Sequence, residues 1–195
     1  MPAVLPTKRG RILIISGPSG SGKTTLQQRL LESRKLKKKL VKSISATTRP
    51  SRQGEEHGRD YLFLSKKNFL YKKRAGHFLE SQKVFRYHYG TPEKNVRDLL
   101  KRGKNVLLCI DVKGAKVVEK KYPDVLKIFI KAPSLQILKK RLSSRGTENK
   151  KDLSSRLKIA REELRASKSY DFVVVNDNLQ KAFIILEQIV CKHIC

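Results

Sequence analysis

Four stretches of the chain are apolar at consecutive positions rather than at alternating ones. Each is short, rich in β-branched residues and followed by a segment of helical pattern; they are residues 11–16, 105–111, 125–131 and 171–176. A run of this kind is typical of a strand that is buried on both faces. Helices between such strands indicate a parallel sheet that is covered on both sides. The pattern therefore predicts an α/β protein with a three-layer fold around a parallel core sheet.

The helices of this core carry local start signals. A helical pattern over residues 24–33 follows the first apolar run, and Ser134 is a suitable N-cap for a helix over 135–142. A serine hydroxyl can accept a hydrogen bond from a free backbone N–H of the first turn. Thr91 is predicted to cap a further helix, with Pro92 at its first position, where the missing N–H of proline is not needed.

Two segments depart from the core pattern. Residues 60–65 and 77–85 have strand character on either side of a short helix that ends near Gly76, which predicts a small β-rich insertion. Residues 145–168 form a polar turn and a long charged helix with little apolar surface, as expected of a mobile lid. We divide the single domain, residues 1–195, into a core of about 9–44, 92–142 and 169–195, an insertion of about 45–91 and a lid of about 143–168.

A glycine-rich loop joins the first predicted strand to its helix. Its sequence, GPSGSGKT, matches the phosphate-loop pattern G-x-x-x-x-G-K-[ST] in the strand–loop–helix context that this pattern requires. Its glycines let backbone N–H groups turn toward phosphates, and the helix N-terminus adds a partial positive charge. Lys23 is expected to reach the β- and γ-phosphates, and Thr24 to offer its hydroxyl to Mg²⁺. The predicted triphosphate-binding residues are Gly17, Pro18, Ser19, Gly20, Ser21, Gly22, Lys23, Thr24 and Thr25.

A second cluster of polar residues lies in SATTRPSRQGEEHGRDY, residues 45–61. Pro50 and Gly54 interrupt it, so Arg49 and Arg52 are expected on a loop rather than on one face of a helix. Two guanidinium groups on a loop suit a phosphate monoester, because each can bind two of its oxygens. The alternative is an exposed basic loop without a ligand.

The rest of the sequence narrows the class of phosphate-loop protein. The N-K-x-D stretch with which GTPases read their base is absent, and motors and transporters need a longer chain. A small kinase fits best. No apolar run approaches a membrane span. The three cysteines lack disulfide or metal spacing, which favours the cytoplasm.

The formal net charge is +28, from lysine and arginine spread along the whole chain. Such a charge attracts nucleic acid and phosphorylated small molecules alike. No recognition motif for nucleic acid accompanies it. The charge therefore fits a solvated basic surface, with non-specific nucleic-acid binding as the alternative.

The chain resembles the guanylate kinases from about residue 11 to its C-terminus. The resemblance rests on six motifs in the family's order: ISGPSGSGKTTL, SATTRPSRQGEEHGRDY, FLE followed by YGTP, IDVKGA, RGT with a later RL, and VVVND. It implies the fold of nucleoside monophosphate kinases, and transfer of the γ-phosphate of ATP to GMP, with dGMP as a further acceptor. It also implies Mg²⁺ bound through Thr24, water and the nucleotide phosphates.

The resemblance implies roles for individual residues. Arg49 and Arg52 match the arginines that hold the GMP phosphate, and Glu55 matches an acid that orients a guanidinium. The other GMP-binding positions are Tyr61 and Tyr89 at the phosphate, Ser45, Glu80, Thr91 and Asp111 at the guanine, and Gly90 in the YGTP motif. Arg145 and Arg156 match the lid arginines that stabilise the transferred group, and Arg141 and Asn176 match contacts to the adenine of ATP.

Two motifs depart from the family pattern, at three positions. The family reads D-I-D where this chain reads CIDVKG, so that Cys109 replaces an acid which supports the magnesium shell, and Lys113 replaces a glutamine. A tyrosine pair is here His88-Tyr89. Two other functions remain open at this point: an inactive guanylate-kinase-like interaction module, and a phosphate-loop protein that binds nucleic acid.

Overall fold

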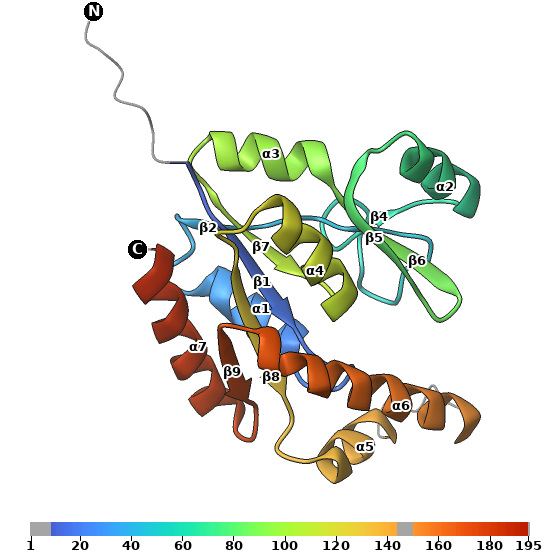
Figure 1. Ribbon diagram of the computed structural model, residues 1–195, viewed down its shortest axis with the longest axis vertical. Coiled ribbons are helices and arrows are strands. Elements are labelled where there is room, and N and C mark those ends of the chain that lie inside the picture. Colours follow the sequence, from blue (N-terminus) through green and yellow to red (C-terminus); the bar gives the residue numbers. More distant parts are fainter. Residues whose placement is uncertain (1–8, 144–149, 195) are drawn as a thin grey trace, which may run out of the picture.

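Figure 1 shows the computed structural model, which describes residues 9–143 and 150–194. A five-stranded sheet forms its centre, in the order β2-β7-β1-β8-β9, and every pairing in it is parallel. The strands are β1 (Ile12–Ser16), β2 (Leu40–Lys42), β7 (Asn105–Cys109), β8 (Leu126–Lys131) and β9 (Phe172–Val175). The predicted parallel sheet is confirmed, with the short edge strand β2 added to the four strands expected.

Helices cover both faces of this sheet (Figure 1). Leu13 and Ile15 of β1 point to one face of the sheet, which a first pair of helices covers. Ile12 and Ile14 point to the other face, which a second pair covers. Alternate residues of a strand point to opposite faces, so a strand between two helical layers must be apolar throughout. The first pair is α1 (Lys23–Glu32) and α7 (Leu179–Ile194), and the second is α3 (Glu93–Lys101) and α4 (Val112–Lys121).

The insertion forms a second sheet of four strands in the order β4-β3-β6-β5. Its long members β5 and β6 make an antiparallel hairpin, and α2 packs beside them through the buried Phe69. The predicted β-rich character and the helix ending near Gly76 are confirmed, although β3 and β6 were not expected as strands. The elements are β3 (Ala46–Thr47), β4 (Leu62–Phe63), α2 (Lys66–Arg74), β5 (Phe78–Val84) and β6 (Tyr87–Pro92).

Helix α5 (Leu135–Ser143) leads from the core to the lid, and the lid contains α6 (Lys150–Ala166) and a 3₁₀ turn at Ser167–Ser169. The predicted cap is present, since the backbone N–H of Ile137 donates to the hydroxyl of Ser134 at 3.2 Å. A small apolar cluster of α5 and α6 includes the buried Ala160. None of the helices in the described part of the chain has both the length and the apolar character needed to cross a bilayer.

Candidate active site

The phosphate loop leaves the carboxyl end of β1 and turns into α1. Gly17, Gly20 and Gly22 have φ angles of 149°, 85° and 88°, which side chains disfavour. At Gly22 a side chain would also collide, because an added Cβ would lie 2.1 Å from the Nδ2 atom of Asn176. The pattern of glycines in the motif is thus required by the backbone path of the loop.

Two residues that the sequence assigned to adenine lie beneath this loop. The side-chain amide of Asn176 donates from Nδ2 to the carbonyl oxygen of Ser21 at 2.8 Å, and the residue is only 4% exposed. Arg141 donates from Nη2 to the carbonyl oxygen of Asn176 at 3.0 Å. The loop is therefore fastened to the end of β9 by a chain of hydrogen bonds.

Lys23 and Thr24 begin α1. The Nζ atom of Lys23 lies 3.3 Å from the carbonyl oxygen of Pro18, so the ammonium group is folded back over the loop. Thr24 and Thr25 are exposed on the first helical turn. In the described ranges no three carboxylate, histidine or cysteine side chains lie close enough to form a metal cage.

Glu80 and Thr91 form a buried pair on the hairpin of β5 and β6. The Thr91 hydroxyl donates to Oε1 of Glu80 at 2.6 Å, and the two residues are 0% and 6% exposed, respectively. Burial raises the pKa of Glu80 to about 7, an effect that Thr91 opposes and Asp111 increases. The prediction that Thr91 caps a helix is wrong: Pro92 is the N-cap of α3, and the Thr91 hydroxyl is engaged by Glu80. The hydrogen bond to Glu80 on the neighbouring strand β5 therefore orients the Thr91 side chain.

Asp111 begins α4, directly after β7. Its carboxylate accepts a hydrogen bond from the backbone N–H of Gly114 at 2.7 Å, which makes it the N-cap. Gly114 was not predicted as a site residue. A Cβ there would lie 2.7 Å from Oε2 of Glu80 and 3.4 Å from Oδ1 of Asp111. The glycine of the IDVKGA motif therefore makes room for both carboxylates. Its position within a family motif was the sequence signal that could have identified it as a site residue.

Arg49 is surrounded by aromatic and acidic side chains. Its Nη2 atom is 2.8 and 2.9 Å from the two carboxylate oxygens of Glu55, and its guanidinium carbon is 5.4 Å from the ring centroid of Tyr61. The rings of Tyr61 and Tyr89 are arranged edge to face, with their centroids 6.3 Å apart. Burial alone would lower the pKa of Arg49, but the bonds to Glu55 outweigh it and raise that pKa. The structure thus brings together four of the residues predicted at the acceptor phosphate.

Arg52 and Ser45 are placed differently. Arg52 is exposed, and its backbone N–H rather than its guanidinium donates to Glu55, at 2.8 Å. Ser45 is partly buried just before β3, where its carbonyl oxygen accepts from the N–H of Leu62. Gly90 is buried in β6 opposite Ala46. Its missing side chain lets the rings of Phe69 and Phe78 pack against the strand.

Of the two predicted lid arginines, Arg145 lies outside the described residues. The guanidinium carbon of Arg156, on α6, is 5.1 Å from the ring centroid of Phe85 at the tip of the β5–β6 hairpin. A third lid residue, Glu163, was missed. Burial raises its pKa to about 7, a shift that Lys23 opposes and Asp111 increases. The carboxyl group of Glu163 is therefore under the electrostatic influence of both Lys23 and Asp111.

Cys109 ends β7 and is a free, partly buried thiol. Burial raises its pKa, and the positive charges of Lys23 and Lys42 reduce that shift. Cys109 pairs with Ile15 of β1, two residues before the phosphate loop begins at Gly17, so a neutral thiol lies near this loop where the family pattern has an acid.

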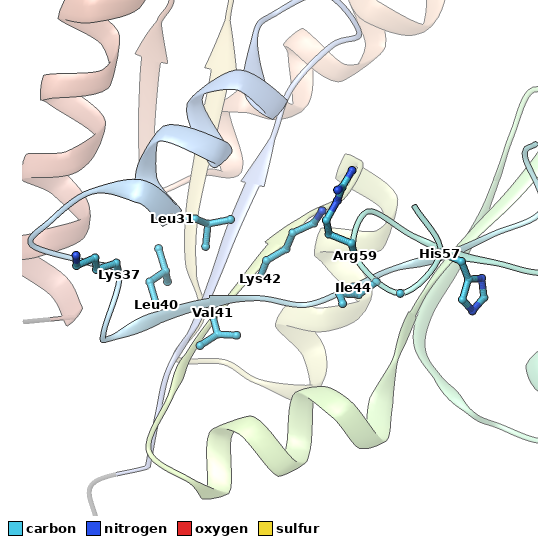
Figure 2. A pocket seen from close by; sticks show the side chains of 9 residues that line it. Leu31, Lys37, Leu40, Val41, Lys42, Ile44, His57 and Arg59 are labelled. Carbon is cyan, nitrogen blue, oxygen red and sulfur yellow. The ribbon is translucent and has the colours of Figure 1, made fainter. Parts of the chain in front are cut away.

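A separate open hollow of about 760 Å³ lies between the end of α1, β2 and the loop at residues 57–59. Figure 2 shows its lining, which is apolar at Leu31, Leu40, Val41 and Ile44 and basic at its rim. None of the predicted site residues lines it.

Comparisons with known proteins agree with this geometry. The sequence profile of a family described as guanylate kinase matches residues 9–193. A guanylate kinase of Caldanaerobacter subterraneus is 40% identical over 96% of this chain and 90% of its own length, and one of Rubrobacter xylanophilus is 43% identical over 90% of each chain. The crystal structure of a guanylate kinase from Anaplasma phagocytophilum has a TM-score of 0.77 and 32% identity, covering 96% of this chain and 87% of that one.

Proposed function

The chain belongs to the guanylate kinase family, and on this basis we propose that it transfers the γ-phosphate of ATP to GMP, giving ADP and GDP. With dGMP as acceptor the product is dGDP. The observation that carries the proposal is a phosphate loop and a buried carboxylate pocket at the same edge of one sheet. The loop follows β1 and Asp111 follows β7, its hydrogen-bonded neighbour, and Glu80 lies against Asp111 and Gly114.

The pocket chemistry favours guanine over adenine. Guanine presents an acceptor at O6 and donors at N1 and N2, and the carboxylates of Glu80 and Asp111 are acceptors for such donors. The hydroxyl of Ser45 is able to donate to O6, whereas the hydroxyl of Thr91 donates to Glu80 and so holds the carboxylate that faces the base. Adenine presents the reverse pattern and would leave buried polar groups unpaired, which is costly. We therefore assign the base of the acceptor nucleotide to this pocket.

The acceptor phosphate is assigned to Arg49, Arg52, Tyr61 and Tyr89. The guanidinium of Arg49 is already oriented, through Nη2 by Glu55 and through Nη1 by the carbonyl oxygen of Pro50, so its orientation is fixed before a phosphate binds. This phosphate is an anionic nucleophile and needs no general base. The protein must instead offset the repulsion between two anions and the charge on the migrating group.

The donor side is assigned to the phosphate loop, with Lys23 at the β- and γ-phosphates. Arg156, and Arg145 beyond the described residues, are assigned to the transferred group. Arg141 and Asn176 fasten the loop and lie where the family contacts adenine. Closure of the lid and insertion would exclude water and so limit hydrolysis of ATP.

A magnesium ion fits the residues present. Thr24 offers an exposed hydroxyl at the start of α1, and the described side chains contain no competing cage. Mg²⁺ commonly binds in this way, through few protein ligands and the substrate phosphates. The bound ion would neutralise charge on the donor phosphates. We further propose that the protein acts in purine nucleotide metabolism in the cytoplasm, a compartment that keeps thiols such as that of Cys109 reduced.

A coupled ADP-release assay with GMP, dGMP, AMP, CMP and UMP as acceptors tests the proposal. Turnover is expected with GMP and dGMP alone, and the variant Lys23→Met reports the background from contaminating kinases. Turnover with AMP or a pyrimidine nucleotide would contradict the base assignment. Absence of turnover with every acceptor would instead support a family member that has become an interaction module.

A further inference from the structure

The GMP insertion and the lid touch at one aromatic contact. Phe85 is at the tip of the hairpin of β5 and β6, and the guanidinium carbon of Arg156 on α6 lies 5.1 Å from its ring centroid. Figure 1 shows this hairpin reaching toward α6 across the open side of the molecule. A guanidinium at this distance from an aromatic face is attracted by the ring quadrupole. The contact joins two segments that are separated in sequence by α3, β7, α4, β8 and α5.

The backbone at Phe85 is unusual. Its φ angle is 55°, and among the described residues it is the one non-glycine residue with a positive φ. The hairpin requires this conformation because Val84 pairs with Tyr87, which leaves Phe85 and Arg86 as a two-residue turn. A bulky side chain is disfavoured there, and its ring is also 43% exposed. Burial in the core therefore does not account for a phenylalanine at this position, whereas a contact made by its ring does.

The position of Arg156 on α6 relates this contact to the phosphate loop. Ala160 of α6 packs with Leu138 and Leu142, whose side chains would lie 3.3 Å from a Cβ at Gly20 of the phosphate loop. Arg156 lies four residues earlier on the helix, about one turn away. The helix therefore spans the distance from the phosphate loop to the hairpin tip. The ring contact is made with the face of the guanidinium and does not itself use the in-plane N–H groups, so contact with the ring and binding of a phosphate are compatible.

We propose that Phe85 is a positioning residue for Arg156, an inference that rests on the function proposed above. The ring holds the guanidinium at the mouth between the two insertions, with its donors directed at the transferred phosphate. Because the ring belongs to the GMP insertion, movement of that insertion on GMP binding carries Arg156 with it. The acceptor thereby helps to assemble the part of the site that stabilises the transition state.

The first test measures kcat and KM in Phe85→Ala, Phe85→Leu and Phe85→Tyr. Loss of the ring should lower kcat about threefold to thirtyfold, the range expected for a cation–π contact, and both KM values should change less than twofold. Phe85→Tyr keeps a ring and should retain at least half of the wild-type kcat. Tyr71→Ala is the matched control, because Tyr71 is an aromatic residue of the same insertion with 64% of its surface exposed; its kcat should be unchanged. Wild-type kcat in both Phe85→Ala and Phe85→Leu would overturn the proposal.

Phe85→Gly separates the ring from the backbone. Glycine adopts a positive φ without strain, so this variant should melt at or above the wild-type temperature while its kcat falls as in Phe85→Ala. A purely structural role for Phe85 predicts instead that activity follows the melting temperature across the series. That correlation would contradict the proposal.

The second test does not depend on turnover. The chain contains no tryptophan, so Phe85→Trp introduces a single indole at the contact. Its emission should differ between this variant and one that also carries Arg156→Met, and the difference should change when GMP and a non-hydrolysable ATP analogue are added together. Identical spectra would show that the two side chains do not meet in solution and would overturn the proposal. If the wild-type protein does not phosphorylate GMP, the proposed function fails, and the spectra still decide whether the contact exists.

Discussion

The donor half and the acceptor half of the candidate active site are built in different ways. The donor half is a run of consecutive residues, 17–24, whose ligands are mainly backbone N–H groups and whose shape depends on glycines with positive φ. The acceptor half is made of side chains. Arg49, Glu80 and Asp111 come from separate parts of the chain and meet through the second sheet and the start of α4.

This difference has an energetic consequence. Backbone N–H groups are neutral, so a loop that presents them carries no buried charge before the nucleotide arrives. The acceptor pocket buries the carboxyl group of Glu80, and its pKa rises to about 7 because the charged form loses solvation. Forming the donor half before the nucleotide binds therefore costs little free energy. In the acceptor half the ionised carboxylate of Glu80 is poorly solvated, and hydrogen bonds from a guanine base would stabilise it.

The largest expected effect is that of Lys23→Met, which should remove catalysis by the donor half and leave GMP binding by the acceptor half intact. Lys23→Met should lower kcat roughly a hundredfold to a thousandfold, the range for loss of one prearranged charge-stabilising donor, because Lys23 is assigned to both the β- and the γ-phosphate. GMP affinity without ATP should be unchanged. Steady-state kinetics and calorimetric titration with GMP measure the two quantities. A large loss of GMP affinity would mean that the halves are not independent.

The same comparison explains what the sequence could predict. Four core strands were predicted because each is continuously apolar; β1, β7 and β8 are largely buried, whereas the edge strand β9 is apolar although Val173 and Val175 are exposed. The phosphate loop was predicted because its backbone shape is encoded in a local motif. The strands β2 and β3 were missed, since three and two residues are too few to show a pattern.

The acceptor half depends on contacts between distant residues, and its local signals were misleading. The dipeptide Thr91-Pro92 has the pattern of a helix start, yet the Thr91 hydroxyl is taken by Glu80 on the neighbouring strand. The role of Gly114 depends on a carboxylate that arrives from β5. Only the family resemblance pointed to Glu80 and Asp111, because isolated acids in a sequence do not show that they converge.

The next effect tests the carboxylate of the acceptor half. Glu80→Gln removes a charged acceptor for guanine N1–H and N2–H, and such a bond contributes about 1.5–3 kcal/mol, or roughly tenfold to a hundredfold in kcat/KM for GMP. The KM for ATP should stay within twofold of wild type. Initial rates at varied GMP and varied ATP measure both. Equal losses for the two nucleotides would refute the assignment of Glu80 to guanine.

Glu80 also predicts a pH dependence. Because its folded pKa is raised from 4.5 to about 7, the KM for GMP should increase as pH falls from 8 to 6 and the carboxylate is protonated. The stability contribution of the proton on Glu80 is complete below about pH 4.5 and is lost as pH rises through 7. Glu80→Gln should therefore be more stable than wild type at pH 8, by on the order of 1–3 kcal/mol, and little changed at pH 5. Chemical denaturation at the two pH values measures this, and an equal difference at both would contradict the shifted pKa.

A smaller effect should follow from filling the space beside Glu80. In Gly114→Ala the added Cβ would lie 2.7 Å from Oε2 of Glu80, so the carboxylate must shift by a few tenths of an ångström. We expect kcat/KM for GMP to fall about threefold to tenfold, since one acceptor is misplaced rather than removed. Stability should be maintained, because alanine is favoured over glycine within a helix. Lys116→Ala, an exposed change on the same helix, is the control, and equal kinetics in the two variants would show that Glu80 does not need this space.

The smallest effect concerns Cys109, where the two halves of the site meet. Its thiol lies near Lys23, and burial keeps it neutral by raising its pKa. A neutral thiol is a poor partner for the water shell of Mg²⁺, which prefers hard oxygen. Cys109→Asp should therefore lower the half-saturating Mg²⁺ concentration by about threefold, less than is usual for groups that support metal ligands, because Thr24 and the phosphates hold most of the shell. The KM for GMP should hardly change. Magnesium titrations at saturating nucleotide measure the effect, with Cys109→Ser as a neutral control and thermal melts to verify folding. If a well-folded Cys109→Asp protein needs as much Mg²⁺ as wild type, this position does not serve the metal, and the cysteine acts only as a small packing residue at the end of β7.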